Sequence, residues 1–527
     1  MIDQVVPRNR LIRTACELIE SRGLALRRSR NSFRMTLTNN RVAASLIRGL
    51  SRRKILRKTR GNYPAPMKAL EVVTRGSSMP LDDSLDLERE AALELARTEA
   101  CRNLLRVHFL QERSKKASGR TLSRSRSLIG SAAVIGAGVM GAGIAHWLAT
   151  KGVSVALKDI DHSRLDKGVS RIKRLLEGAV ARDLLSLVEA RDAMRRVLPT
   201  VDGGAVAASE LVIESAVEDL DVKRDLIREI EGRVGPRAVV ATNTSALSVS
   251  RIADGAERPE RVVGLHFFNP VRRMPLVEVV RGEDTDDATM DRAVDFALQM
   301  GKTPVVVADS PGFLVNRILT PYLVEAGRMF EAGGDAVRID QAMLAFGMPM
   351  GPLRLIDEIG GDVALHVAES LRASLGERFA PPPLLGRMRS AGLLGRKAGL
   401  GFYDYSESPA RPNRGALALS PEGARRREAV SGTGDRLIAL MLNESLRCLS
   451  EEIVEDPEDL DLAMILGAGF APQTGGPLRY ADALGASLLV SRLEAFRAVE
   501  GERFAPCDLL LETAELNQTI YPRKGES

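Results

Sequence analysis

The sequence contains few aromatic residues, few cysteines and no long hydrophobic run. Aromatic residues make up 4% of the 527 positions, so we expect a mainly aliphatic core. The cysteines are scattered and form no CxxC pair, which argues against a disulfide framework or a zinc site (Cys16, Cys101, Cys448 and Cys507). No apolar run reaches the ~18–20 residues of a membrane span, and the N-terminus lacks the apolar core of a secretory signal. These features predict a protein of the reducing cytoplasm.

Histidine is also scarce, and its spacing matches no metal site. The five histidines are spread over the whole chain (His108, His146, His162, His266 and His366). We therefore expect no bound metal. At 527 residues the chain should hold several domains.

Positive charge is concentrated at the N-terminus. Residues 1–60 hold 16 Lys and Arg but only three acids (Asp3, Glu17 and Glu20), although the whole chain has a net charge of +6. Such an arm can bind nucleic acid or an anionic membrane, or it can be a solvated remnant or a docking face. No aromatic residues alternate with the basic ones as base stacking requires, so we expect no nucleic-acid binding. A transit peptide is a further alternative, against which the three acids count.

A glycine-rich turn between an apolar strand and an apolar helix is the most informative feature. Residues 132–135 are apolar, and Gly136-x-Gly138-x-x-Gly141 follows them directly. In a dinucleotide-binding turn the first glycine permits a tight turn, the second admits a pyrophosphate, and the third lets helix and strand pack closely. The helix N-terminus adds free N–H groups. The alternative is a glycine-rich turn that binds no ligand.

A second apolar strand leads to Asp159, 23 positions after Gly136. A carboxylate here can bond a ribose 2′-hydroxyl and would repel a 2′-phosphate, which favours NAD over NADP. Lys158 stands beside it and slightly weakens this preference.

Strand and helix patterns alternate from residue 130 to about 308. The alternation predicts a Rossmann-type, doubly wound α/β domain with a parallel sheet, and residues 162–197 should form two inserted helices. Candidate strands lie at residues 132–136, 153–158, 211–215, 238–242, 262–267, 276–280 and 303–307.

The chain beyond Pro311 is mostly helical in pattern and contains an internal repeat. The block Gly-Pro-Leu-Arg begins at Gly351 and again at Gly476, with matching residues around both. We predict two tandem copies of one helical domain, separated by a linker at about 406–433. A duplicated domain that can pair with itself often internalises a two-fold interface, although the second copy could simply support the first.

The segment before the glycine-rich turn is predicted to contain one long helix. Ser84 can cap a helix over residues 84–116. The prolines in residues 61–83 should interrupt regular structure, and residues 118–127 form a Ser/Arg linker. The predicted domains are therefore 1–126, 127–308, 309–408 and 430–527.

His266 and Glu278 form the candidate catalytic pair. His266 closes an apolar strand, so it should emerge at the carboxyl edge of the sheet, where ligands bind in α/β folds. Glu278 follows 12 positions later inside the next apolar strand, where an unpaired acid would be costly to bury. A buried Glu beside His orients the ring and stabilises its protonated form, so that the ring can act as a base. The alternative for His266 is a satisfied core histidine.

Two further polar residues fit the same sheet edge. Ser245 follows the strand before His266, and Asn316 stands at the start of the helical segment. A hydroxyl and an amide could hold a substrate oxygen beside the histidine. Their alternatives are a helix N-cap for Ser245 and a solvated helix position for Asn316.

Together these segments resemble the 3-hydroxyacyl-CoA dehydrogenase family, most closely the dehydrogenase half of the alpha subunit of the multifunctional fatty-acid oxidation complex. The similarity covers about residues 127–527. The matching segments are Val134–Gly141, Asn243–Ser245, His266–Pro270, Pro275–Glu278, Pro311–Arg317, Gly395–Tyr403 and both Gly-Pro-Leu-Arg blocks.

The resemblance implies NAD-dependent oxidation of a 3-hydroxyacyl-CoA to the 3-ketoacyl-CoA in fatty-acid β-oxidation. It makes His266 the general base and Glu278 its partner, with Ser245 and Asn316 holding the 3-oxygen and neighbouring groups. The residues that it implies for the NAD site are Gly136, Gly138, Met140, Gly141, Asp159, Glu218, Lys223 and Asn269.

The N-terminus departs from this family. The alpha subunit begins with a crotonase-type enoyl-CoA hydratase, whereas residues 1–126 resemble only the tail of that half and its connecting helix. The resemblance implies that the helix over residues 84–116 packs on the helical domains, as the connecting helix does in that family. We therefore expect a truncated derivative or a fragment without hydratase activity. Possible partners are a thiolase beta subunit or further copies of the chain. Two other functions stay open: a non-catalytic scaffold that binds a thiolase or a membrane, and a dehydrogenase for another 2- or 3-hydroxy acid.

Overall fold

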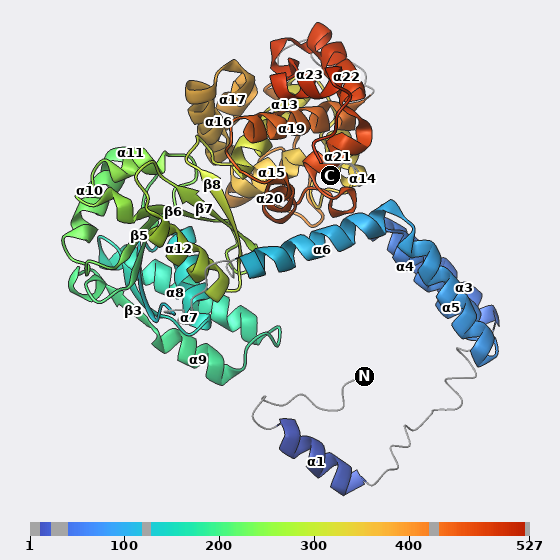
Figure 1. Ribbon diagram of the computed structural model, residues 1–527, viewed down its shortest axis with the longest axis horizontal. Helices are drawn as coiled ribbons and strands as arrows, with labels where there is room; N and C mark the ends of the chain where they lie inside the picture. Colours follow the sequence, from blue (N-terminus) through green and yellow to red (C-terminus); the bar gives the residue numbers. More distant parts are fainter. Residues whose placement is uncertain (1–10, 23–40, 118–127, 421–431, 522–527) are drawn as a thin grey trace. The chain divides into compact units, whose positions relative to one another are not determined.

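The computed structural model describes residues 11–22, 41–117, 128–420 and 432–521 (Figure 1). The chain divides into two compact units, Met1–Thr98 and Glu99–Ser527. The predicted linker at 118–127 lies outside the described residues, as do residues 421–431 of the second predicted linker. Within the described ranges, no helix is long and apolar enough to cross a membrane. The domain boundaries drawn from the sequence stay predictions.

The first unit contains α1 (Leu11–Arg22), α3 (Arg41–Thr59), α4 (Pro64–Gly76) and α5 (Leu81–Ala96). The expectation that prolines interrupt residues 61–83 was correct only at the helix boundaries: residues 61–63 and 77–80 are not helical, whereas residues 64–76 form α4. Pro64 lies in the first turn of α4 and Pro80 is the N-cap of α5. Proline starts helices well, because the first backbone N–H groups have no partner within the helix.

The predicted single helix over residues 84–116 was also wrong, because the chain forms two helices there. α5 ends at Ala96 and α6 spans Glu99–Ala117, with Ser84 inside α5 rather than at its cap. The Thr98 backbone N–H and hydroxyl both donate to Leu95 O, which closes the turn between the helices.

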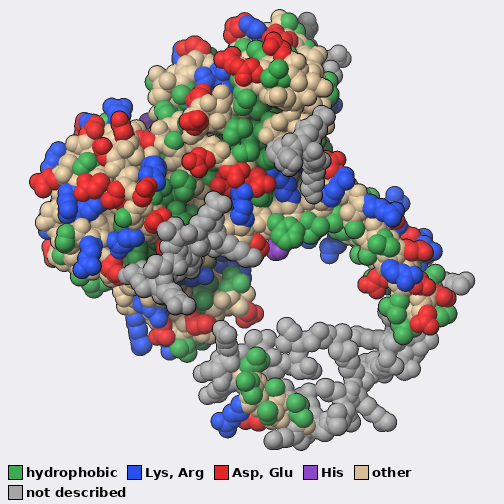
Figure 2. All heavy atoms as spheres, in the orientation of Figure 1, with side chains coloured by type: hydrophobic (Ala, Val, Ile, Leu, Met, Phe, Trp, Pro, Cys, Tyr) green, Lys and Arg blue, Asp and Glu red, His purple; other side chains and the backbone are tan. Residues whose placement is uncertain are grey.

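Helix α6 belongs to the second unit and packs on its C-terminal part, as predicted for the connecting helix. The Asn103 side chain donates to Gln473 O at 2.9 Å, and Arg113 forms ion pairs with Asp456 and Asp459. Figure 2 shows hydrophobic side chains on the surface of α6. Leu105 and Phe109 of this helix are 51% and 65% exposed. One face of α6 therefore contacts the C-terminal part of the second unit, whereas the opposite face is exposed within that unit.

The centre of the second unit is an eight-stranded sheet in the order β3-β2-β1-β4-β5-β6-β7-β8. We call residues 128–310 the sheet domain. The strands are β1 (Ser131–Ile135), β2 (Ser154–Lys158), β3 (Val197–Thr200), β4 (Leu211–Glu214), β5 (Val239–Thr242), β6 (Val262–Phe267), β7 (Leu276–Arg281) and β8 (Thr303–Ala308). Each of the seven predicted strands is present within one residue at either end. The edge strand β3 was missed, because its residues Val197–Thr200 include a proline and form no apolar run.

The expectation of a wholly parallel sheet was wrong at one position, since β6 and β7 are antiparallel. Residues 268–275 connect them and are too few for the crossover that parallel neighbours need. The other pairs are parallel. Because β7 runs back beside β6, side chains of the two strands can face each other directly.

Helices cover both faces of the sheet. Ala132 and Val134 of β1 belong to one buried hydrophobic cluster, whereas Ala133 and Ile135 belong to another on the opposite face. The helices of the sheet domain are α7 (Val139–Thr150), α8 (His162–Val180), α9 (Leu187–Arg195), α10 (Leu220–Glu231), α11 (Val249–Ala253) and α12 (Asp287–Gln299). The two helices predicted within 162–197 are α8 and α9, which begin at capping residues Asp161 and Ser186.

The remainder, residues 311–521, forms the helical region. Its first copy of the repeat contains α13 (Val315–Glu331), α14 (Ala336–Phe346), α15 (Pro352–Ile359), α16 (Gly361–Leu375) and α17 (Pro383–Ser390). Its second copy contains α19 (Thr433–Ser450), α20 (Pro457–Ala463), α21 (Pro477–Leu484), α22 (Ala486–Glu500) and α23 (Asp508–Glu515). Between them lie β9 (Tyr403–Asp404), β10 (Arg411–Pro412) and α18 (Arg414–Ala418).

The internal repeat predicted from the sequence is present in the structure. Asp340 accepts a hydrogen bond from Leu353 N at 2.9 Å, and Asp461 accepts one from Leu478 N at 2.7 Å. Each aspartate also accepts a tyrosine hydroxyl at 2.7 Å, from Tyr403 and Tyr521 respectively. Equivalent residues therefore make equivalent bonds in both copies.

The two copies pack together through reciprocal buried ion pairs. Arg317 of α13 bonds Glu444 of α19 at 2.8 Å, and Arg436 of α19 bonds Glu325 of α13 at 2.6 Å. A second arginine reaches each carboxylate, Arg378 to Glu444 at 3.0 Å and Arg503 to Glu325 at 2.7 Å. Such an exchange of partners is the signature of a two-fold interface, here within one chain.

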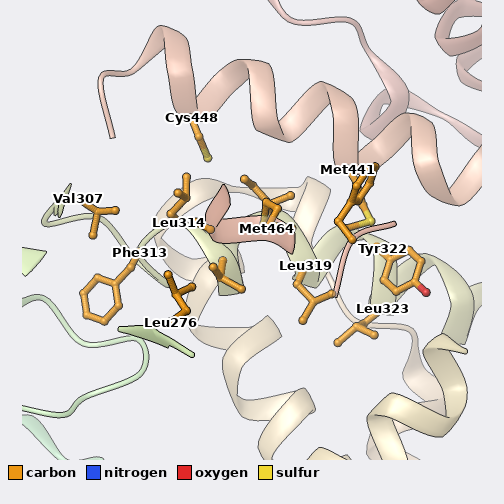
Figure 3. Close-up of a cluster of buried hydrophobic side chains, with 14 of the residues drawn as sticks. Leu276, Val307, Phe313, Leu314, Leu319, Tyr322, Leu323, Met441, Cys448 and Met464 are labelled. Carbon is orange, nitrogen blue, oxygen red and sulfur yellow. The ribbon is translucent and has the colours of Figure 1, made fainter. Parts of the chain in front are cut away.

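An apolar cluster joins the sheet domain to both copies (Figure 3). Leu276 of β7, Leu314 beside α13 and Met464 after α20 lie in this cluster, with Met441 and Cys448 of α19 pointing toward it. All are buried, so the sheet edge and the helical region share one core.

Candidate active site

His266 and Glu278 face each other across the antiparallel pair β6–β7. They are direct register partners, and His266 Nδ1 lies 2.6 Å from Glu278 Oε2. His266 is 6% exposed and Glu278 is fully buried. With Nδ1 donating to the carboxylate, Nε2 carries the free lone pair of the neutral ring. The pair therefore has the geometry of an oriented base.

The second oxygen of Glu278 holds the start of the helical region. Glu278 Oε1 accepts the N–H groups of Leu314 and Val315 at 3.1 and 2.9 Å. The rings of Phe268 and Phe313 lie 4.5 and 5.7 Å from the His266 ring. One carboxylate thus links the histidine to the N-terminus of α13, and two aromatic rings shield the histidine from water.

Asn316 and Ser245 meet at the same place. Asn316 Nδ2 donates to Ser245 O at 3.0 Å, so the first turn of α13 is tied to the loop after β5. Asn243, in the same loop, accepts the Phe267 N–H at 2.9 Å, next to His266. The structure therefore brings together the four residues that were predicted at this sheet edge.

Glu218 fixes the loop that carries Ser245. Its Oε1 accepts the Thr244 hydroxyl at 2.7 Å and the Ser245 N–H at 2.9 Å. Burial raises the pKa of Glu218, but the Lys223 ammonium and these donors outweigh it and hold the pKa below its ordinary value. Glu218 is therefore ionised at neutral pH.

Lys223 is buried between two carboxylates. Its Nζ lies 2.9 Å from both oxygens of Glu214 and 3.4 Å from Glu218. Glu214 also accepts the Thr242 hydroxyl at 2.7 Å, so the ends of β4 and β5 are bonded together. Sequence reasoning missed Glu214 and the bond made by Asn243. Both stand at strand ends, but only the sheet register shows what they contact.

The glycine-rich turn fits a dinucleotide. Gly136 has φ +103°, and a Cβ there would meet Ser215 O at 2.4 Å, while a Cβ at Gly141 would meet Gly136 O at 1.8 Å. A Cβ at Gly138, the N-cap of α7, would meet no atom within 4 Å. The first and third glycines are therefore needed for packing, and the second leaves open space where a pyrophosphate can approach.

Asp159 stands at the end of β2, beside this turn. Its carboxylate accepts the N–H groups of Ala137 and Ile160, both at 2.7 Å. Lys158 lies 3.5 Å from Glu229. The charge of Lys158 is therefore partly satisfied within the protein.

Comparison with known proteins identifies the family of this chain. Residues 131–310 match the NAD binding domain of 3-hydroxyacyl-CoA dehydrogenase, and residues 312–405 and 433–523 match its C-terminal domain. The fatty acid oxidation complex subunit alpha of Shewanella amazonensis is 35% identical and aligns with 99% of this chain and 74% of its own length. The chain belongs to the 3-hydroxyacyl-CoA dehydrogenase family. It is therefore an enzyme with a dehydrogenase role, and its sheet domain is the NAD-binding domain of that family.

Two solved structures of dehydrogenases are similar to this chain. The 3-hydroxybutyryl-CoA dehydrogenase of Escherichia coli K12 is 30% identical, covers 74% of this chain and 98% of its own, and superposes with a TM-score of 0.62. The (S)-3-hydroxybutyryl-CoA dehydrogenase of Ralstonia eutropha is 38% identical, covers 53% of this chain and all of its own, with a TM-score of 0.51.

The remaining predicted residues lie at the borders of the site. Met140 is in the first turn of α7, and Asn269 is exposed at the start of the β6–β7 connection. Among the residues that the structure describes, no group of three or more His, Cys, Asp or Glu could hold a metal ion.

Proposed function

We propose that this dehydrogenase oxidises the 3-hydroxyl group of a 3-hydroxyacyl-CoA to a ketone in fatty-acid β-oxidation, with NAD as the acceptor. The observation that carries the proposal is the His266–Glu278 pair, bonded to the start of α13 and placed next to Ser245 and Asn316. A buried acid that orients a histidine at a sheet edge serves proton abstraction.

In this mechanism His266 Nε2 takes the proton of the substrate hydroxyl. Glu278 keeps the ring in place and stabilises the imidazolium that forms. Ser245 and Asn316 hold the 3-oxygen and neighbouring groups, so that the reacting carbon is oriented. When bound, the nicotinamide supplies the acceptor for the hydride that leaves C3.

The residues that would hold NAD follow from the turn after β1. Gly136, Gly138 and Gly141 shape the phosphate cradle, and Asp159 would bond the adenosine ribose and disfavour NADP. Met140, Glu218, Lys223 and Asn269 complete the cofactor site, with Glu218 and Lys223 also supporting the loop of Ser245.

The test is NADH formation by the pure protein with 3-hydroxybutyryl-CoA and NAD. The His266→Gln variant should lose about 10²–10⁴-fold in turnover. It should bind NAD as the wild type does, because His266 lies outside the phosphate cradle. A folded variant with a near-normal rate would overturn the role of His266. Absence of NADH with the wild-type protein would favour the scaffold that binds a thiolase or a membrane.

Substrate range and partners stay predictions. A series of 3-hydroxyacyl-CoA chain lengths and of free hydroxy acids would define the substrate. Co-purification with a thiolase beta subunit, and the mass of the pure protein in solution, would test both partners. The cytoplasmic location expected from cysteine usage also stays a prediction.

A further inference from the structure

A cavity of about 210 Å³ lies in the helical region, away from the candidate active site. Its wall is formed by α14 from the first copy and by α19, α21 and α22 from the second. Most of the lining side chains are apolar (Ala342, Phe346, Ile438, Ala439, Leu442, Leu484 and Leu489). Polar groups are confined to Asp435, Tyr480 and Arg492.

The internal repeat relates this cavity to the candidate active site. The reciprocal pairs Arg317–Glu444 and Arg436–Glu325 align α13 with α19 at a separation of 119 positions. At that separation Asp435 corresponds to Asn316, the residue of α13 that bonds the Ser245 loop. The cavity wall on α19 is therefore the counterpart of the α13 face at the proposed substrate site.

The apolar residues of the two faces also correspond. Ile438 and Leu442 of α19 align with Leu319 and Leu323 of α13, and those two leucines retain 8% and 7% exposure. In the first copy the loop that carries Ser245 covers the start of this face, because Asn316 Nδ2 donates to Ser245 O at 3.0 Å. In the second copy the corresponding space is the cavity.

The rim of the cavity is polar and partly exposed. Arg492 forms an ion pair with Asp435 at 3.1 Å, and their side chains are 33% and 54% exposed. Burial raises the pKa of Tyr480, so its hydroxyl stays neutral at physiological pH. An apolar interior with charged groups only at its mouth suits a ligand with a hydrocarbon tail and a polar head that stays in water.

We propose that this cavity is a second acyl-binding site, which takes the unbranched aliphatic chain of an acyl group and leaves its head outside. An apolar cavity of about 150 Å³ already binds a molecule as large as benzene, so this one can accept several methylene groups. The catalytic histidine has no part in it. Binding here goes beyond the proposed oxidation and does not depend on it.

Titration calorimetry of the full chain with acetyl-CoA and decanoyl-CoA, without NAD, tests the proposal. Decanoyl-CoA should bind with one more equivalent per chain than acetyl-CoA, and each added methylene should tighten this extra site about fourfold until the cavity is full. Equal stoichiometry for both ligands would overturn the proposal.

Two variants assign the extra site. Ala439→Phe places a ring in the cavity and should abolish the extra equivalent, whereas Ala495→Phe adds the same ring at an exposed position of α22 and should keep it. Loss of the extra equivalent in both variants, or in neither, would also overturn the proposal. If Ala439→Phe does not fold, the comparison of the two ligands on the wild-type protein still decides. The aliphatic ligand could be a free fatty acid or an acyl-CoA thioester, and sodium decanoate distinguishes the two. If decanoate binds at the extra site, free fatty acids are ligands; if only decanoyl-CoA binds there, the ligand is the thioester.

Discussion

Glu278 lies directly opposite His266 in the β6–β7 pair, and its two oxygens serve two domains. Oε2 bonds the histidine at 2.6 Å, while Oε1 accepts the N–H of Val315 at the start of α13. The orientation of the proposed base and the attachment of the helical region therefore depend on one buried carboxylate.

Glu278→Gln should lower turnover by at least about 10²-fold and leave the protein folded. The amide oxygen can still accept the N–H groups at α13, but the protonated histidine loses its anionic partner. The acid side of the pH–rate profile should therefore move to lower pH. Steady-state rates across pH measure this, with exposed Glu283→Gln as the control. An unchanged profile with unchanged turnover would contradict the role of Glu278.

Asp159→Ser should narrow the preference for NAD over NADP. The shorter side chain reaches the ribose poorly and no longer repels a 2′-phosphate. The ratio of kcat/KM for the two cofactors is the measurement. Asp161→Ser is a matched control, because serine can still cap α8. A wild-type enzyme that prefers NADP would show that Asp159 has been misinterpreted and would point to Lys158.

His146→Leu should make stability less sensitive to acid. Burial, and then the charge of Arg272, lower the pKa of His146 from 6.5 to about 4. Between these values only the unfolded chain binds the proton, so stability falls as pH drops from 6.5 to 4, by up to roughly 3 kcal/mol. Neither ring nitrogen has a hydrogen-bond partner among the described residues, so leucine should be tolerated. Melting temperatures from pH 4.5 to 7.5 test this, with exposed His108→Leu as control; the same acid sensitivity in His146→Leu would contradict it.

Arg106→Met should destabilise the second unit by about 1–3 kcal/mol, the usual cost of removing one partner of a buried polar group. Arg106 of α6 bonds Asp461 at 3.2 Å, and Asp461 is fully buried. Asp461 keeps its bonds from Leu478 N and the Tyr521 hydroxyl, and burial raises its pKa to about 7, so it can take up a proton when Arg106 is removed. Adding Asp461→Asn should recover part of the loss, because a neutral amide needs no positive partner and its oxygen can still accept the Leu478 N–H. Urea unfolding of both variants measures this, and Arg102→Met on the exposed side of α6 should have little effect. Equal stability of Arg106→Met and wild type would show that α6 contributes little through this pair.

Crotonyl-CoA should not be hydrated by this chain alone. A hydratase needs an oxyanion site and a pocket that activates water. All the elements described before β1 are helices, and the acids within residues 1–60 stand among arginines. Incubation with crotonyl-CoA and NAD should yield NADH only after a separate hydratase is added, which also serves as the positive control. NADH without that addition would refute the prediction.

Much of the fold and site follows from local patterns, and the errors have identifiable causes. Apolar runs predict seven of the strands. His266 and Glu278 stand in two consecutive short strands, and because these strands pair, the two residues lie opposite each other. The direction of β7 relative to β6 was not predicted, because an apolar run does not show in which direction its strand will pair. Only the length of the connection, eight residues, restricts that direction. The bond of Asn243 to Phe267 N depends on the register of β5 and β6, which no local pattern encodes.

The reciprocal pairs Arg317–Glu444 and Arg436–Glu325 lie within one chain rather than between two. Association of the two helical copies therefore costs no translational entropy and cannot be reversed by dilution, so this interface should not weaken at low protein concentration. In a symmetric dimer of identical chains a substitution would occur twice at the interface, whereas here a substitution in one copy occurs only once. The sequence of the first copy, which lies beside His266, is thus constrained by the proposed reaction, while the second copy can accumulate substitutions independently.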